Sequence, residues 1–139
     1  MTAFLLDTNV VSELRRTRPH GAVVAWLSAC APEQLHICSV TVLEIQTGIE
    51  LTRPRDPSRA AAMDEWLDEA LTSFPVIVLD APICRLAARW GIRSGQTNFE
   101  DCLIAATASA RNLTVATRNV RHFQGYGVPV LNPFADRAP

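Results

Sequence analysis

The stretch TAFLLDTNVVSELRR, residues 2–16, contains the pattern that decides the fold. Its apolar run at residues 2–6 stops abruptly at Asp7, and residues 9–16 have a helical composition with cationic side chains toward their end. A short apolar strand followed at once by a polar residue and a helix is typical of an α/β protein. We therefore expect Asp7 at the carboxyl end of a strand, where such folds bind their ligands.

The same alternation of strand and helix continues along the chain. Further β-favouring runs lie at residues 35–40, 76–79, 113–117 and 128–131, and helical patterns lie at residues 22–31, 41–51, 57–74, 81–92 and 99–110. Asp56 before Pro57 predicts a helix start, Thr41 with Glu44 has the form of a capping box, and residues 94–98 read as a polar loop. The pattern predicts a three-layer α/β sandwich with a mainly parallel sheet of about five strands and helices on both faces.

The length and composition indicate one ordinary globular domain. A chain of 139 residues with 48% hydrophobic and 19% charged residues is long enough for a single core and unlike a disordered protein. We predict one domain over residues 1–139, with a loose tail at residues 134–139. No apolar run is long enough to cross a bilayer and the start is not a signal peptide, so we expect a cytoplasmic protein without membrane contact.

The charged and cysteine residues limit the possible ligands. A net charge of −1 argues against a domain that coats nucleic acid, so any such contact must be local. All 13 basic residues are arginine, which suits bidentate phosphate contacts, although a coding bias explains it equally well. We predict reduced, mostly buried thiols at Cys30, Cys38, Cys84 and Cys102. Cys30, His36 and Cys38 offer a zinc site as the alternative, but their spacing lacks a CxxC pair.

Acidic residues stand where the predicted sheet would gather them. Asp7 ends the first strand, Glu44 lies early in the helix after the second, and Asp101 lies near the start of the helix before the fourth; Asn119 follows the fourth strand. Buried carboxylates need compensation, and a divalent cation supplies it. Oxygen ligands that meet a phosphate and retain water favour Mg²⁺ or Mn²⁺, so we predict a metal centre at Asp7, Glu44 and Asp101.

Each acid also has a purely structural interpretation. Asp7 could cap the helix that begins near Asn9, Glu44 could complete the capping box, and Asp101 could be favoured only by the helix dipole. These interpretations predict no common location for the three side chains, whereas the metal hypothesis requires one.

Four blocks of the sequence resemble a known family. LLDTNVVSEL (residues 5–14), SVTVLEIQTGI (39–49), EDCLIAATA (100–108) and TVATRNVRHFQGYGVPVLNPF (114–134) are similar to PIN-domain proteins, above all the VapC and FitB toxins of bacterial toxin–antitoxin pairs. The resemblance implies a PIN-like fold and a metal-dependent endoribonuclease toxin that acts on structured RNA such as tRNA or rRNA. It also implies a small antitoxin partner and a homodimer. By motif match, Asp7, Glu44 and Asp101 occupy the acidic ligand positions of that family.

Two residues depart from the family pattern. Asn119 stands where a fourth acid is common, so it can hold a ligand or water but brings no charge, and a second metal should bind less tightly. His122 stands where many relatives have Asp; it could bind phosphate, but we predict an exposed loop histidine. We place Glu100 outside the metal ligands because it points about 100° away from Asp101 around a helix.

Other polar residues near these acids are candidates for supporting roles. The hydroxyls of Thr8 and Thr117 and the amide of Asn9 could orient ligands or waters, or serve only as ordinary strand-end and cap hydrogen bonds. We expect substrate phosphates to contact arginines near the cleft, although these could equally be a solvated cationic surface: Arg15, Arg16, Arg18, Arg118 and Arg121. The tryptophans lie on apolar helical stripes and are expected in the core or a dimer contact: Trp26, Trp66 and Trp90.

The sequence therefore predicts a ribonuclease in which a metal-activated water hydrolyses the phosphodiester bond. No Ser-His-Asp or Cys-His arrangement competes with this hypothesis. Two alternatives remain: a catalytically weakened PIN domain that acts by binding RNA or protein, and a DNA nuclease of the same fold.

Overall fold

The computed structural model describes residues 1–95 and 99–135 of the chain. Its five-stranded sheet has the order β3-β2-β1-β4-β5, and every neighbouring pair is parallel. The strands are β1 (Phe4–Leu6), β2 (Leu35–Cys38), β3 (Val76–Ile77), β4 (Thr114–Ala116) and β5 (Val130–Leu131). The predicted parallel sheet is confirmed, with each strand two residues shorter than the run that predicted it.

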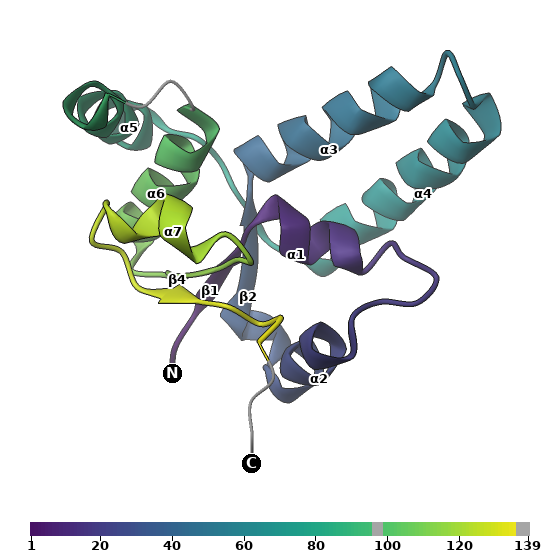
Figure 1. The fold of residues 1–139 in the computed structure, drawn as a ribbon, viewed down its shortest axis with the longest axis horizontal. Helices are drawn as coiled ribbons and strands as arrows, with labels where there is room; N and C mark the ends of the chain where they lie inside the picture. The colour runs from purple at the N-terminus through teal and green to yellow at the C-terminus, as the bar shows by residue number, and fades with distance from the viewer. Residues whose placement is uncertain (96–98, 136–139) are drawn as a thin grey trace.

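Helices cover both faces of the sheet. They are α1 (Thr8–Glu13), α2 (Gly21–Ala29), α3 (Ser39–Thr52), α4 (Pro57–Ser73), α5 (Ala81–Ser94), α6 (Phe99–Arg111) and α7 (Val120–Gln124), with a 3-10 turn at Pro32–Gln34. Figure 1 shows α5, α6 and α7 on one side of the sheet and α2, α3 and α4 on the other. The predicted three-layer α/β sandwich is confirmed.

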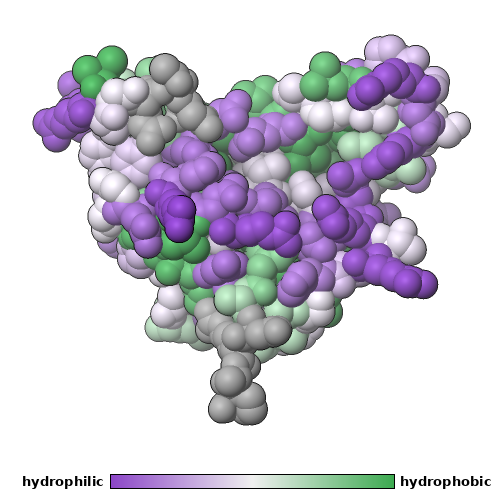
Figure 2. Space-filling view, in the orientation of Figure 1, coloured by the Kyte–Doolittle hydropathy of each residue, from purple (hydrophilic) through white to green (hydrophobic). Residues whose placement is uncertain are grey.

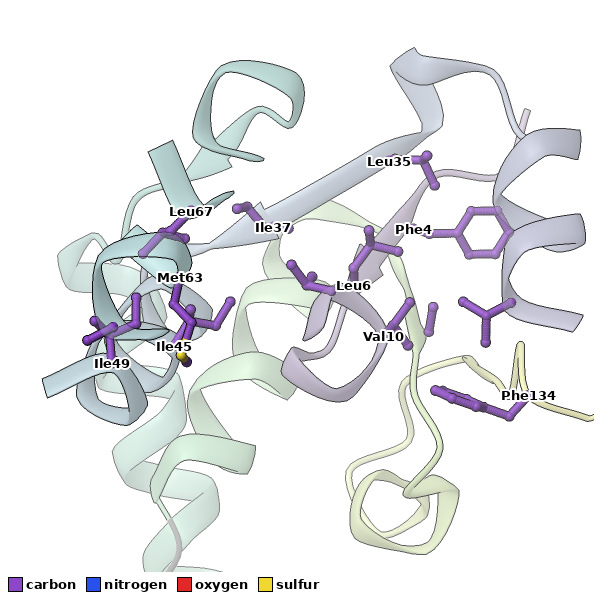
Figure 3. Packing of buried hydrophobic residues seen from close by; sticks show 14 residues of the cluster. Phe4, Leu6, Val10, Leu35, Ile37, Ile45, Ile49, Met63, Leu67 and Phe134 are labelled. Atoms are coloured by element: carbon purple, nitrogen blue, oxygen red, sulfur yellow. The ribbon is translucent and has the colours of Figure 1, made fainter. Parts of the chain in front are cut away.

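The central strand β1 is buried on both faces, which explains its uninterrupted apolar sequence. Phe4 and Leu6 face the cluster formed with α3 and α4, where the labelled side chains of Figure 3 converge. Leu5 faces the opposite way, into the cluster that α6 and α7 cover. Trp26 and Trp66 pack on the first cluster and Trp90 on the second, so all three tryptophans contribute to the core.

Helix boundaries follow the predictions in part. Asp56 caps α4, since its carboxylate accepts a hydrogen bond from the Arg59 amide at 3.1 Å. The predicted capping box of Thr41 and Glu44 is wrong: α3 begins at Ser39, and Thr41 is fully buried within its first turn. The helix predicted to end at residue 92 continues to Ser94; residues 96–98 of the predicted loop lie outside the described residues.

Two further expectations fail near the C-terminus. The short helix α7 was not predicted, and Phe134, predicted in a loose tail, is 91% buried. The Phe134 ring contacts the His20 ring at 5.4 Å and lies 3.8 Å beneath the Arg118 guanidinium, so its apolar surface anchors this end of the chain. Residues 136–139 of that tail lie outside the described residues.

The predicted burial of the cysteines is confirmed for Cys38 and Cys102, whereas Cys30 is half-buried and Cys84 is exposed. No helix in residues 1–95 or 99–135 is long and apolar enough to span a membrane.

Candidate functional site

Three carboxylates from distant parts of the sequence line one cavity. Asp7 precedes α1, Glu44 lies in α3 and Asp101 lies in the first turn of α6. The cavity has a volume of about 330 Å³, and its other lining residues are Thr8, Asn9, Glu100, Asn119 and His122. The parallel strands β1, β2 and β4 bring these segments to one edge of the sheet because their carboxyl ends all point there.

Asp7 is held in this cavity by three hydrogen bonds. Its side chain is 6% exposed, and Oδ1 accepts a hydrogen bond from the Thr8 amide at 2.8 Å. Oδ2 accepts from the Thr117 hydroxyl at 2.7 Å and from the Asn9 side-chain amide at 3.3 Å. Asp7 is therefore the helix cap that one interpretation predicted, and it also faces the cavity. Burial raises its pKa, and the Thr117 hydrogen bond opposes that rise.

Thr117 and Asn9 tie the ends of β1 and β4 together around Asp7. The fully buried Thr117 hydroxyl also accepts hydrogen bonds from the Asn119 amide at 2.9 Å and from the Asn9 side chain at 3.3 Å. The Asn9 side-chain oxygen accepts from the Arg118 amide at 3.1 Å. These polar groups fix the orientation of Asp7, and this contact network goes beyond ordinary strand-end hydrogen bonding.

The side chain of Glu44 is oriented by Thr8 of α1, and not by Thr41 of its own helix as the capping box suggested. Its Oε1 accepts a hydrogen bond from the Thr8 hydroxyl at 2.8 Å, which joins α3 to the start of α1. Burial raises the pKa of Glu44 to about 7, and the nearby carboxylates Glu100, Asp7 and Asp101 add to the rise. A carboxylate with such neighbours favours either a proton or a cation.

Asp101 has a partner that the sequence interpretation missed. Its Oδ2 lies 3.0 Å from Nδ1 of His122, and burial raises its pKa while His122 opposes the rise. His122 is exposed, as predicted, but it lies in α7 and not in a loop, and it lines the cavity. Asn119 before this segment and Gly125 after it are helix start and stop signals that could have revealed α7.

Glu100 also lies closer to the site than predicted. It is exposed but lines the same cavity, and its charge helps to raise the pKa of Glu44. Glu100 and Asp101 both lie in the first turn of α6 and line the cavity, and the placement of Glu100 outside the metal ligands stays a prediction.

The donor chemistry of the cavity fits a hard divalent cation, although the side chains are not gathered into a finished ligand set. No three Asp, Glu, His or Cys side chains among the described residues are arranged to hold an ion, and this includes the zinc alternative at Cys30, His36 and Cys38. The cavity nevertheless concentrates carboxylate oxygens whose ionised forms are disfavoured by burial. A cation would relieve that cost, and Mg²⁺ commonly uses one or two carboxylates with several waters.

The predicted arginines do not line this cavity. Arg118 stacks on Phe134, Arg121 is exposed on α7, and Arg15 and Arg16 lie beyond the far end of α1. Arg18 is exposed in the loop before α2. None of the predicted arginines therefore lines the acidic cavity.

The chain is similar to known proteins along nearly its whole length. The chain is 34% identical to the toxin FitB of Neisseria gonorrhoeae over 95% of this chain and 99% of that protein. It is 32% identical to the VapC ribonuclease Y4jK of Sinorhizobium fredii over 94% of this chain and 96% of that protein.

Solved structures show the same fold. The crystal structure of FitAcB from Neisseria gonorrhoeae matches with a TM-score of 0.83 and 33% identity, covering 94% of this chain and 98% of that chain. A toxin-antitoxin complex from Klebsiella pneumoniae matches with a TM-score of 0.72 and 25% identity, covering 94% and 98%. The PIN domain family model matches residues 4–127. The chain belongs to the PIN-domain family, within the group that contains the FitB and VapC toxins.

Proposed function

We propose that the protein is a metal-dependent endoribonuclease and the toxin of a VapBC-type toxin–antitoxin pair. The observation that carries this proposal is the cavity shared by Asp7, Glu44 and Asp101. A relative with 32% identity over nearly its whole length is named a VapC ribonuclease, which favours RNA as the substrate. Structured RNA, tRNA or rRNA, is the substrate class that we propose.

In this proposal Asp7, Glu44 and Asp101 hold Mg²⁺ or Mn²⁺. The ion would lower the pKa of a coordinated water and stabilise the charge that builds on the scissile phosphate. The chain's own residues would orient the acids: Thr117 and Asn9 direct Asp7, and Thr8 directs Glu44. Asn119 lines the same cavity and would hold a water or a phosphate oxygen through its amide.

A small antitoxin and a second copy of the chain are the proposed partners. The complex from Klebsiella pneumoniae is a toxin-antitoxin complex by its title, and the FitAcB structure resembles this chain over almost its entire length. We infer a cytoplasmic location because the proposed RNA substrates are found there.

The test is a cleavage assay with purified protein that has been freed of partner. Labelled tRNA, rRNA fragments and DNA of matched length are incubated with Mg²⁺, Mn²⁺ or EDTA. We expect RNA cutting that needs the metal and falls by at least about a hundredfold in Asp7→Asn and Asp101→Asn, because these acids would position the ion. Asp68→Asn is the matched control, since Asp68 is exposed on α4 and does not line the cavity.

The same assay decides between this function and its two alternatives. A binding-only PIN domain is favoured by one observation, the contact of Asp101 with His122, which stands where many relatives have Asp. That alternative predicts RNA binding without cutting under every metal condition. A DNA nuclease would cut only the DNA. Cutting of RNA that EDTA leaves unchanged would contradict the metal-dependent proposal.

A further inference from the structure

A second cavity, of about 580 Å³, lies beyond the opposite end of α1 from the acidic cavity. Two segments that are far apart in the sequence form its walls. Arg15, Arg16 and Thr17 follow α1, and Arg59, Ala62 and Met63 belong to α4. Three guanidinium groups and a hydroxyl therefore surround one hollow with a small apolar floor.

The positive charge of this hollow has little compensation within the protein. Arg15 and Arg59 form no ion pair with any described residue, and no carboxylate lines the cavity. Arg16 approaches Glu13 only to 3.5 Å, and the other oxygen of Glu13 accepts the His20 amide at 2.7 Å.

Arg53, at the end of α3, differs from these arginines because its charge is paired. Arg53 lies 2.8 Å from Glu50 and 2.6 Å from Asp64, so its charge is satisfied within the fold. Three like charges around one hollow repel one another and do not stabilise the folded chain. A bound anion would remove that repulsion, and guanidinium forks match phosphate oxygens closely.

The position of the hollow relates it to the acidic cavity. Thr8, at the start of α1, lines the acidic cavity, and Arg15, just beyond the end of α1, lines the hollow. The seven residues between them correspond to about 10 Å at the rise of a helix. Figure 2 shows hydrophilic side chains gathered in a band across α7 and α1 toward the loop that follows α1. A stacked strand advances about 3.4 Å per nucleotide, so about three nucleotides span the length of backbone that separates these two lining residues.

We propose that Arg15, Arg16, Thr17 and Arg59 form a phosphate subsite that holds the RNA strand about three nucleotides from the bond to be cut. This inference rests on the proposed function, which supplies the RNA. It adds Arg59, which sequence reasoning did not connect with Arg15 and Arg16 because only the packing of α4 beside the end of α1 brings them together. A protein bound through this subsite needs no bulk positive charge, which agrees with the net charge of −1.

The test measures RNA affinity without cleavage. Fluorescence anisotropy of a labelled single-stranded oligonucleotide is recorded in EDTA over a range of salt concentrations, with wild type, Arg59→Ala and Arg59→Lys. Arg55→Ala is the matched control, because Arg55 is exposed in the turn before α4 and does not line the hollow. A labelled dinucleotide, too short to span both cavities, is measured in parallel, and thermal melting checks that each variant is folded.

We expect Arg59→Ala to weaken binding of the long oligonucleotide by about tenfold, because a charge-assisted hydrogen bond is lost. The slope of affinity against salt should fall by about 0.7, the share of one phosphate contact in single strands. Arg59→Lys should retain the slope but only part of the affinity. The affinity for the dinucleotide should be the same in Arg59→Ala and wild type, and Arg55→Ala should bind the long oligonucleotide as wild type does.

Three results would overturn the subsite. Equal RNA affinities of Arg59→Ala and Arg55→Ala would contradict the subsite. If wild type still cuts RNA in that case, the proposed function is unaffected. An acidic peptide is titrated in the same assay, and normal RNA affinity of Arg59→Ala together with lost binding of this peptide would assign the hollow to a protein partner. Failure of wild type both to bind and to cut RNA would overturn the proposed function together with the subsite.

Discussion

Thr117 is the residue on which the geometry of the acidic cavity depends most. Its buried hydroxyl donates to Asp7 and accepts from both Asn9 and the Asn119 amide, so one oxygen connects β1, β4 and the segment before α7. The sequence identified Thr117 as a candidate only because it follows an apolar run beside other polar residues. Its hydrogen-bond partners depend on the pairing of β1 with β4, which no local pattern encodes.

We predict that Thr117→Val lowers the free energy of unfolding by about 1–3 kcal/mol, because Asp7 and the Asn119 amide lose a buried partner. Thr117→Ser retains the hydroxyl and should lose much less. Urea denaturation of both variants beside wild type measures the difference. A larger loss in Thr117→Ser than in Thr117→Val would show that the methyl group, and not the hydroxyl, is what the site requires.

Glu44 gives a second prediction, for the protein without metal. Its pKa rises from 4.5 to about 7 on folding, so the folded state prefers the protonated acid, and stability is lost as pH rises between these values. Glu44→Gln should therefore stabilise the EDTA-treated protein above pH 7 by about 1 kcal/mol, a figure reduced for partial exposure to water. Below pH 4.5 the variant and wild type should melt together.

Thermal melting at both pH values, with the exposed Glu65→Gln as the matched control, checks this expectation. A lower melting temperature of Glu44→Gln above pH 7 would show that the Thr8 hydrogen bond outweighs the burial of the charge.

At the scale of elements, the sequence predicted every strand and six of the seven helices described. The predicted boundaries differ from those of the structure where a strand is followed directly by a helix. The β-favouring run at residues 35–40 continues past the true end of β2, because Ser39 and Val40 belong to the first turn of α3. Val40 is buried there and is β-branched, so burial in the core gives the same apolar signal in either element.

Helix α5 is capped by Asp80, and the contribution of this cap to stability can be tested. The Asp80 carboxylate accepts the Ile83 amide at 3.0 Å, and it also lies 3.5 Å from an exposed Arg111 guanidinium. We predict that Asp80→Ala costs about 1 kcal/mol and that Asp80→Asn, which retains the cap, costs much less. Comparable losses of the two variants in urea denaturation would instead assign the effect to the ion pair with Arg111, although exposed ion pairs usually contribute little to stability.

At the scale of the whole molecule, the acids meet because the sheet is parallel and β1 lies at its centre. The sequence predicted the parallel sheet from alternating elements, and the rule that ligands bind beyond the strand ends then predicted the shared cavity. The basic hollow could not be predicted in the same way. It depends on how α4 packs beside the end of α1, and that packing is set by core side chains of α4 such as Met63, which no local pattern connects with α1.

The central claim is that Asp7, Glu44 and Asp101 hold one ion between them, and calorimetric titration of the metal-free protein with Mn²⁺ measures it directly. We predict saturable binding in wild type and in the control Asp68→Asn, with binding weakened by at least about tenfold in Asp7→Asn, Glu44→Gln and Asp101→Asn. Binding that is unchanged in these three variants, or absent from wild type, would contradict the account.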